Sequence, residues 1–346
     1  MKLIVQIPCH NESTTLAETL SAIPRHIAGL DTVEILVIDD GSDDGTGDVA
    51  FTNGADAVLR FSQRQGLARA FKAGIDAALR AGADIIVNTD GDNQYDGADI
   101  PRLVAPILAG EADMSVGDRD PGSIRHFSLV KRLLQRLGSW SMRRLSGTAV
   151  ADSTSGFRAY SREAALRINV ISEFSYTLET LIQAGTRRLR IANVAIEARQ
   201  TPRASRLASS TFVYVKSAAA TMARAYSMYQ PLKVFFYAGT LFMLGAVAIG
   251  LRFIYRYLFV DAGAGNVQSL ILAAILAIVA FQTMSLGVLA DLQAANRKLI
   301  EEVLYRQRRR DVERREPGSV TDLPGVRSAS AETAVPAAVR NVGDEP

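Results

Sequence analysis

Short apolar runs alternate with longer helical patterns in the first third of the chain. Four runs are brief, rich in β-branched residues and followed by turn-forming residues, as buried strands are: 3–7, 34–38, 57–61 and 84–88. Three intervening segments carry apolar residues at helical spacing: 13–23, 66–81 and 100–108. This alternation predicts an α/β fold with a mostly parallel sheet and helices on both faces. Ligands of such sheets bind beyond the carboxyl ends of the strands, so the residues that follow the strands are the first candidates for a site.

Two long uncharged segments lie in the last third of the chain. Residues 234–251 and 267–290 contain no charged side chain. Each is close to the roughly 20 residues that span a bilayer. A pair of buried core helices is the alternative, but uncharged runs of this length are rare in soluble domains. We therefore predict two transmembrane helices.

Basic residues near these segments indicate their orientation. Lys233 precedes the first segment, and a cluster of lysine and arginine follows the second between residues 297 and 310. By the positive-inside rule, both flanks belong in the cytoplasm. Arg252 and Arg256 oppose this assignment, but their aromatic neighbours indicate snorkelling to the interface. With no signal-like N-terminal run, we expect a multi-pass protein of the cell (inner) membrane with its first domain on the cytoplasmic face.

Composition refines the remaining boundaries. Residues 211–229 interleave apolar and basic residues, which is typical of an amphipathic helix at a membrane surface. Residues after Glu316 are rich in Pro, Gly, Ala and Ser and predict a disordered tail. The pI near 9.0 is attributed to membrane-surface charge rather than to nucleic-acid binding, because basic residues cluster between residues 297 and 310, directly after the second uncharged segment. The single cysteine, Cys9, excludes an intramolecular disulfide and a cysteine-cluster metal site.

Three acidic motifs each follow a predicted strand. They occupy residues 8–12, 39–46 and 90–94. Taken singly, each has an ordinary explanation as a turn or a helix cap. Together they place polar and acidic side chains along one edge of one sheet, which indicates a binding site.

The third motif favours a divalent cation. Asp90 and Asp92 place two carboxylates on one side of an extended segment, and hard oxygen ligands suit Mg²⁺ or Mn²⁺. An EF-hand is excluded because Tyr95 stands where its loop requires glycine. The chain also has neither a P-loop nor a GxGxxG motif after the first strand. A metal-assisted site for a nucleoside diphosphate remains.

These motifs resemble those of the inverting family 2 glycosyltransferases of the GT-A fold. The resemblance rests on Pro8-x-x-Asn11-Glu12, Asp39-Asp40-Gly41-Ser42-x-Asp44-Gly45-Thr46 and Asp90-x-Asp92-x-Gln94. The branch that makes dolichyl- or polyprenyl-phosphate sugars is indicated by the two spans and by three further motifs: Gly117-x-Arg119, Asp152-x-x-Ser155-Gly156-Phe157-Arg158 and Ser205-Arg206-Leu207. The resemblance covers roughly residues 1–305. Together with the patterns above, it predicts a GT-A domain over 1–205, interfacial helices over 206–231, two transmembrane helices over 232–291, a cytosolic helix over 292–316 and a disordered tail over 317–346.

The resemblance also implies roles for individual residues. The donor base and ribose would be held by Pro8, Glu12, Asp39 and Asp40. The metal would be bound by Asp90, Asp92 and Gln94. Donor or acceptor phosphates would be met by Arg119, Lys131, Arg132, Arg158 and Arg206, the last at a position where the family more usually has lysine. Catalytic roles would fall to Asp92, Arg119 and Asp152, and Glu179 is a further possible organiser of the site.

The implied reaction is transfer of a sugar from a UDP- or GDP-sugar to a polyprenyl phosphate, with inversion and with Mg²⁺ or Mn²⁺. Transfer to a diacylglycerol-type lipid or to a growing polysaccharide is the alternative, and an inactive membrane scaffold is another. The Gln-x-x-Arg-Trp signature of processive polysaccharide synthases is missing, because the only tryptophan, Trp140, follows Ser139. The sugar, the nucleotide and a possible homo-oligomeric state stay open.

Overall fold

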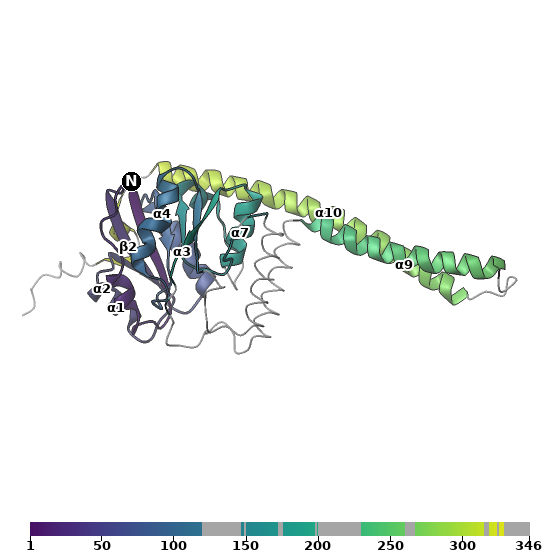
Figure 1. Ribbon diagram of the computed structural model, residues 1–346, viewed down its shortest axis with the longest axis horizontal. Coiled ribbons are helices and arrows are strands. Elements are labelled where there is room, and N and C mark those ends of the chain that lie inside the picture. Colours follow the sequence, from purple (N-terminus) through teal and green to yellow (C-terminus); the bar gives the residue numbers. More distant parts are fainter. Residues whose placement is uncertain are drawn as a thin grey trace, which may run out of the picture. The chain divides into compact units, whose positions relative to one another are not determined.

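The computed structural model describes residues 1–119, 147–148, 150–171, 176–197, 199, 230–259, 267–314, 318–323 and 325–328 (Figure 1). They belong to two compact units. The first comprises Met1–Ser210 with Tyr305–Pro346, and the second comprises Thr211–Leu304. Of the predicted interfacial segment 206–231, only residues 230 and 231 are among those described.

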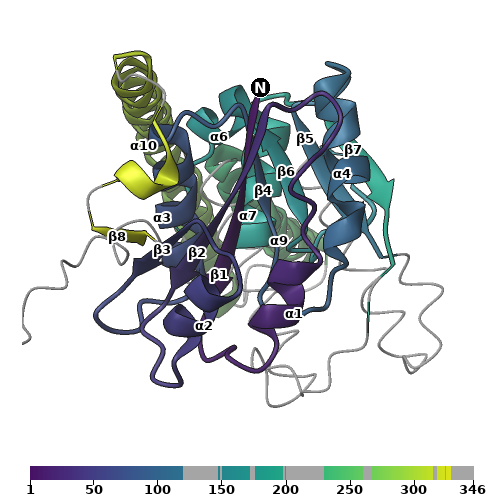
Figure 2. The ribbon, with the colours of Figure 1, turned by 90° about the vertical axis from the view of Figure 1, so that its left-hand side faces the viewer.

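An eight-stranded sheet forms the centre of the first unit (Figure 2). Its strands are β1 Lys2–Cys9, β2 Thr32–Asp39, β3 Ala57–Arg60, β4 Ile85–Asn88, β5 Met114–Asp118, β6 Arg158–Ser161, β7 Ile191–Ala195 and β8 Val326–Ser328. Their order across the sheet is β7-β5-β6-β4-β1-β2-β3-β8. Parallel pairs join β1 to β2 and β4, β2 to β3, and β5 to β7, whereas β6 and β8 run antiparallel to their neighbours. The predicted mostly parallel α/β fold is confirmed.

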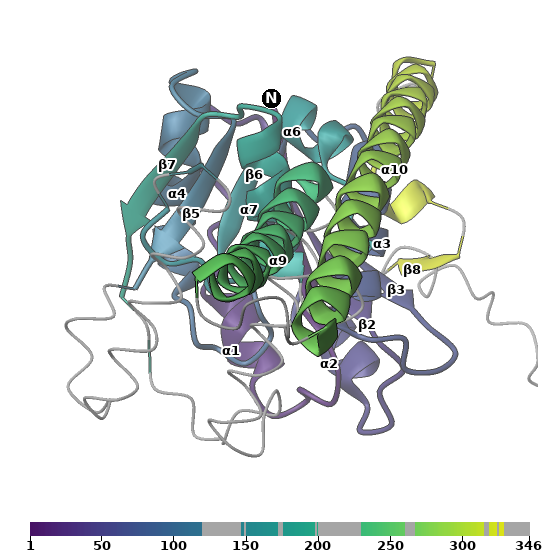
Figure 3. The same cartoon turned by 90° about the vertical axis from the view of Figure 1, so that its right-hand side faces the viewer.

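Helices cover both faces of this sheet. Those described in the first unit are α1 Leu16–Ser21, α2 Thr46–Thr52, α3 Leu67–Arg80, the 3-10 turn η1 Gly97–Asp99, α4 Ile100–Leu108, α6 Arg162–Arg167 and α7 Tyr176–Thr186. Because successive strand residues point to opposite faces, Leu3, Val5 and Ile7 of β1 join a core with α1 and α4. Gln6 faces the other side, against α3, where α6 and α7 also lie (Figure 3).

Two long apolar helices dominate the second unit. Helix α9 spans Pro231–Phe259, and α10 runs without a break over Val267–Glu313, through the predicted cytosolic helix. They lie side by side, and glycines permit a close approach: a Cβ on Gly239 would lie 2.6 Å from Met284 Cγ. Both are long and apolar enough to cross a membrane, yet only 11% and 17% of their most apolar windows are buried. Burial this low favours transmembrane helices over the alternative of soluble core helices.

The C-terminal segment corrects the prediction of a tail that is disordered throughout 317–346. Residues Val320–Asp322 form the 3-10 turn η2, and β8 pairs with the edge strand β3 (Figure 2). Ser319 caps η2 through a capping box, and Val320 is fully buried. The Pro- and Gly-rich composition of the tail hid a few apolar residues that dock on the domain.

Candidate functional site

The loops that follow β1 and β2 are fastened to each other at the carboxyl edge of the sheet. The Asn11 N–H donates to Ser42 Oγ (3.0 Å), and the Glu12 N–H donates to Thr46 Oγ1 (3.0 Å). Asn11 adopts a left-handed φ of 54°, which asparagine tolerates better than most residues. Its side-chain oxygen accepts a hydrogen bond from the Asp43 N–H (3.1 Å). The first two sequence motifs therefore form one structural unit.

Both carboxylates of the Asp39–Asp40 pair are buried, and they bind groups of the second motif and of residues 60–66. Asp39 accepts a hydrogen bond from the Ser42 N–H (2.8 Å) and forms an ion pair with Arg60 Nε (3.3 Å). Asp40 accepts from the N–H groups of Gln65 (2.6 Å) and Gly66 (2.9 Å). In this structure the pair therefore organises the surrounding loops, and its predicted contact with the donor base and ribose stays a prediction.

The other two predicted donor-binding residues differ in exposure. Pro8 is buried in β1, opposite Ile38 of β2, and there it shapes the end of the strand. The half-buried Glu12 lies beside the third motif, since a Cβ on Gly91 would come within 3.7 Å of Glu12 Cβ and Cγ. The first and third motifs are thus brought together as the sequence predicted.

The acidic turn after β4 holds the predicted metal ligands. Asn93 adopts a left-handed φ of 57°, and the Gln94 N–H returns to Asp92 Oδ1 (3.1 Å). Burial raises the pKa of Asp90 to about 7, and the negative charge of Asp92 adds to the rise. Among the described residues, none donates a hydrogen bond to the Asp90 carboxylate. The turn therefore concentrates negative charge that a cation would neutralise.

These residues fit a divalent cation bound mainly by carboxylates and substrate. Within the described residues, no group of three or more His, Cys, Asp or Glu side chains is placed to hold a metal. Mg²⁺ and similar ions commonly take one or two carboxylates and complete their shell with water and substrate phosphates. Asp90 and Asp92 suit that arrangement, and the predicted ligation by the Gln94 side chain stays a prediction.

Arg119 follows β5 and is held by Asp152. Its Nε and Nη2 atoms donate to the two carboxylate oxygens at 2.6 and 3.2 Å, and Nη2 also donates to Thr154 Oγ1 at 2.7 Å. Asp152 further accepts hydrogen bonds from the N–H groups of Thr154 (3.0 Å) and Ser155 (3.2 Å). Although burial opposes ionisation, Arg119 and these donors lower the pKa of Asp152. A carboxylate bonded in this way is a poor base. In this structure Asp152 positions Arg119, and its predicted catalytic role stays a prediction.

The Arg119 guanidinium lies among groups of the predicted site. Its side chain is 14% exposed and lies 5.9 Å from the centre of the Tyr95 ring. Its positive charge lowers the pKa of Asp90, against the larger effects of burial and Asp92. Among the described residues, none accepts a hydrogen bond from Nη1. The structure therefore brings together a fixed positive charge and the acidic pair.

Arg158 does not occupy the position predicted for it. Its side chain is fully buried, and all three nitrogens donate within the protein. The acceptors are the backbone oxygens of Ser155 (2.8 Å), Thr177 (2.7 Å) and Ser153 (3.0 Å), together with Thr180 Oγ1 (2.7 Å). The prediction of a substrate contact is therefore wrong in this structure. Arg158 is the first residue of β6, and it ties the segment after Asp152 to α7.

Sequence reasoning missed the residues that hold Gly156 against Asp90. The Gly156 N–H donates to Tyr95 Oη (3.1 Å), and its carbonyl accepts from Asn88 Nδ2 (2.9 Å). Asn88 Nδ2 also donates to Tyr176 Oη (2.9 Å). A Cβ on Gly156 would lie only 2.8 Å from Asp90 Oδ2. The tyrosines lie 61 and 20 residues from Gly156 along the chain, and no local pattern marks them.

Lys131, Arg132 and Arg206 lie outside the described residues. Glu179 is buried in α7, where its carboxylate accepts hydrogen bonds from the Ile171 N–H (3.1 Å) and from Gln183 Nε2 (3.3 Å). These contacts give Glu179 a role in fixing the backbone before α7.

The sequence is similar to a family of known enzymes. The family model Glycosyl transferase family 2 matches residues 4–168. An undecaprenyl-phosphate mannosyltransferase of Micrococcus luteus is 31% identical over 206 residues, which are 57% of this chain and 83% of that protein. A polyprenol monophosphomannose synthase of Mycolicibacterium smegmatis is 34% identical over 176 residues, which are 49% of this chain and 65% of that protein.

A solved structure supports the fold. Glucosyl-3-phosphoglycerate synthase of Mycobacterium tuberculosis, in complex with Mn²⁺, UDP-glucose and phosphoglyceric acid, aligns with a TM-score of 0.53 at 24% identity. The alignment covers 65% of this chain and 80% of that one. With the mostly parallel sheet and the acidic turn at its carboxyl edge, these similarities show that the chain is a glycosyltransferase with a GT-A domain, a member of glycosyl transferase family 2.

Proposed function

We propose that the protein transfers a sugar, with inversion, from a UDP- or GDP-sugar to a polyprenyl phosphate at the cytoplasmic face of the cell membrane. The observation that carries the proposal is the fixed Arg119 beside the Asp90–Asp92 turn, in a chain that also has two exposed apolar helices. The names of the Micrococcus and Mycolicibacterium relatives support the same acceptor class.

The acidic turn would serve the leaving group. Asp90 and Asp92 would hold Mg²⁺ or Mn²⁺, which supplies charge neutralisation to the departing nucleoside diphosphate. The loops at Asp39–Thr46 and Asn11–Glu12 would form the wall for the nucleoside, because their mutual hydrogen bonds fix their shape before the donor arrives.

Arg119 would serve the phosphate of the acceptor. A phosphate monoester is already anionic at neutral pH, so its attack needs no strong protein base. This agrees with Asp152, whose oxygens are occupied by donors. Asp152 fixes the Nε–Nη2 edge of the guanidinium and leaves Nη1 for the acceptor. Positioning and charge stabilisation would then supply most of the rate.

The apolar helices would place this chemistry at the membrane. The tail of a polyprenyl phosphate lies in the bilayer and its head lies at the surface, so a membrane-anchored site meets it without extracting the lipid. A diacylglycerol would use the membrane location but not the phosphate-binding charge, which is why we favour the phosphate.

The test is an acceptor comparison with purified full-length protein in detergent. A panel of radiolabelled UDP- and GDP-sugars is offered with polyprenyl phosphate, with the corresponding prenol and with diacylglycerol. We expect label to enter the phosphate-bearing lipid only. Equal labelling of prenol or diacylglycerol would contradict the proposed acceptor.

Two Arg119 variants sharpen this test. Charge-assisted contacts contribute about 1.5–3 kcal/mol each, so Arg119→Ala should raise the KM for lipid phosphate about tenfold or more with little change in donor KM. Arg119→Lys keeps the charge but loses the paired geometry, so its KM for lipid phosphate should lie between those of the wild type and Arg119→Ala. Arg102→Ala serves as the control, because it removes an exposed arginine of α4 that pairs, within the described part of the chain, only with Asp99 at the start of the helix. Unchanged acceptor kinetics in Arg119→Ala would refute its role.

A further inference from the structure

The segment that follows α10 binds the sheet where β1 and β2 begin, at the end opposite the carboxyl edge. We call residues 318–323 and 325–328 the C-terminal strap. At its start, Lys2 Nζ donates to the Gly318 carbonyl (2.7 Å) and forms an ion pair with Glu34 (2.8 Å). Glu34 also accepts a hydrogen bond from the Val320 N–H (3.0 Å), and Val320 is fully buried. The strap thus begins on β1 and β2.

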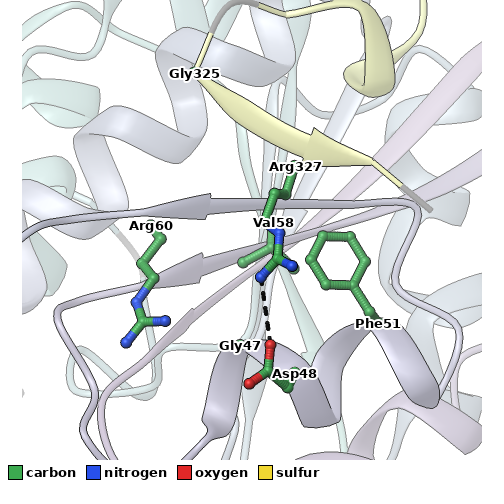
Figure 4. Close-up of a pocket in the computed structure, with 7 residues that line it drawn as sticks. All are labelled: Gly47, Asp48, Phe51, Val58, Arg60, Gly325 and Arg327. Atoms are coloured by element: carbon green, nitrogen blue, oxygen red, sulfur yellow. Dashed lines mark hydrogen bonds and ion pairs between the residues drawn. The ribbon is translucent and has the colours of Figure 1, made fainter. Parts of the chain in front are cut away.

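The strap ends on α2, which follows the Asp39–Thr46 loop in the chain, and on β3, whose last residue contacts that loop. Strand β8 pairs antiparallel with β3, with Val326 opposite Leu59. Arg327 forms an ion pair with Asp48 of α2 (3.4 Å) and lies 5.6 Å from the centre of the Phe51 ring (Figure 4). Helix α2 begins at Thr46, where the loop ends, and β3 ends at Arg60, beside the loop.

Arg60 follows Leu59, which pairs with Val326 of the strap, and its own side chain contacts the loop. It lines a cavity of about 180 Å³ whose walls come from α2, β3 and the strap (Figure 4): Gly47, Asp48, Phe51, Val58, Arg60, Gly325 and Arg327. Arg60 also forms the ion pair with Asp39 (3.3 Å) and donates to the Ser42 carbonyl (2.9 Å). Ligand pockets typically measure about 300–1,000 Å³. The cavity is therefore too small for a nucleotide. We interpret it as a packing gap between the strap, α2 and β3, next to the loop.

The end of α10 adds a second attachment to the same unit. Arg308 forms an ion pair with Asp76 of α3 (2.9 Å) and donates to the Ile168 carbonyl (3.0 Å). Tyr305 Oη donates to Glu163 (2.9 Å). The described residues between Tyr305 and Ser328 therefore contact α3 and α6, the β1–β2 end of the sheet, and β3 with α2.

We propose that the C-terminal strap positions the Asp39–Thr46 loop for the nucleotide, with Arg327 as its positioning residue. The strap would hold α2 and β3 in place, and Arg60 would pass that constraint to Asp39 and Ser42. Only the step from the loop to the nucleotide rests on the proposed function. The hold of the strap on the loop rests on the contacts above.

The test compares two shortened proteins. One ends at Glu316 and lacks the strap, and the other ends at Ser328 and keeps it. Hydrogen exchange measures the protection of the 39–46 loop and of Ala57–Arg60 without any ligand. Calorimetry measures the binding of UDP and of GDP in the presence of Mn²⁺. We expect the chain ending at Glu316 to exchange faster at both places and to bind its nucleotide about fivefold or more weakly, a typical size for coupling between sites. The chain ending at Ser328 should match the full-length protein.

Point variants guard against simple misfolding. Arg327→Ala should weaken nucleotide binding, as removal of the strap does. Arg80→Ala, which replaces an exposed arginine at the end of α3, should leave nucleotide binding unchanged. A merely structural strap would lower the folded fraction and kcat but leave the nucleotide affinity and donor KM unchanged. Unchanged loop exchange, or unchanged affinity in both the chain ending at Glu316 and Arg327→Ala, would overturn the proposal. A full-length chain that bound neither nucleotide would refute the proposed function, and the exchange data would still decide whether the strap holds the loop.

Discussion

Replacing Gly156 with alanine tests whether the position of Asp90 is set by its packing. The added Cβ would lie 2.8 and 3.0 Å from the two Asp90 carboxylate oxygens and 2.9 Å from Tyr176 Oη. Gly156 cannot retreat easily, because Tyr95 binds its N–H and Asn88 binds its carbonyl. The methyl group should therefore displace the Asp90 carboxylate.

The expected magnitude follows from these contacts. Overpacking of this kind typically costs about 1–3 kcal/mol of stability, so the variant should fold with a lower Tm. Functional geometry tolerates shifts of only about 0.5 Å. Relieving contacts below 3 Å requires a movement of that order, because ordinary carbon contacts begin near about 3.5 Å. Disturbing the residues that support metal ligands typically lowers affinity about 10- to 100-fold, and we expect a loss of Mn²⁺ affinity in that range.

The assay separates position from stability. Mn²⁺ affinity is measured by calorimetry and by electron paramagnetic resonance, with UDP or GDP present, at a temperature where the variant is folded. Gly97→Ala is the control, because its Cβ would lie 2.6 Å from the Ala22 backbone, so that it is overpacked without touching Asp90. Gly97→Ala should lose stability and keep its Mn²⁺ affinity. Equal Mn²⁺ affinity in Gly156→Ala and the wild type would refute the reasoning.

Three further predictions concern the metal, pH and topology. Asp92→Asn should lower turnover about a thousandfold or more while the protein remains folded by circular dichroism, because a ligand charge is lost; near-normal activity would count against the metal site. Since the pKa of Asp90 is raised to about 7, the stability that its protonated form contributes is complete below the ordinary aspartate pKa and is lost as pH rises through 7. Without metal, the Tm of the wild type should therefore fall more between pH 5.5 and pH 8 than the Tm of Asp90→Asn does. Mn²⁺ should raise the Tm of the wild type more at pH 8 than at pH 5.5; equal Mn²⁺ shifts at both pH values would contradict this. A cysteine at Gly263 should be labelled from outside the cell by an impermeant thiol reagent, whereas one at the exposed Glu111 should not, given that native Cys9 is buried; the reverse pattern would overturn the proposed orientation.

The parts of the fold that follow from periodicity were predictable. The runs at 3–7, 34–38, 57–61 and 84–88 became β1 to β4, because parallel strands covered by helices on both faces are mostly apolar. The sequence also placed the acidic motifs at the carboxyl edge, since strand direction alone decides where such loops meet.

Residues whose role depends on long-range packing were not predictable. Arg158 and Arg119 both follow the family pattern, but only the three-dimensional fold shows that one is fully buried and bonded to α7 while the other lies beside Asp90. Strap residues such as Val320 were missed for a related reason. The partners of the strap lie nearly 300 residues earlier in the chain, and composition averaged over the tail cannot detect a few apolar residues that dock there.

Because the strap pairs the last strand with β3, the order of synthesis matters for folding. Lys2 and Gly318 are separated by 316 residues, so the contact between them forms only after both apolar helices have left the ribosome. Until then the outer edge of β3 is an unpaired strand edge, and exposed edges of this kind invite association with other chains. Domains generally fold from the N-terminus as the chain is made. The nascent enzyme therefore passes through an interval in which the sheet of its GT-A domain is open at the β3 edge, and that edge closes only when synthesis has reached the strap.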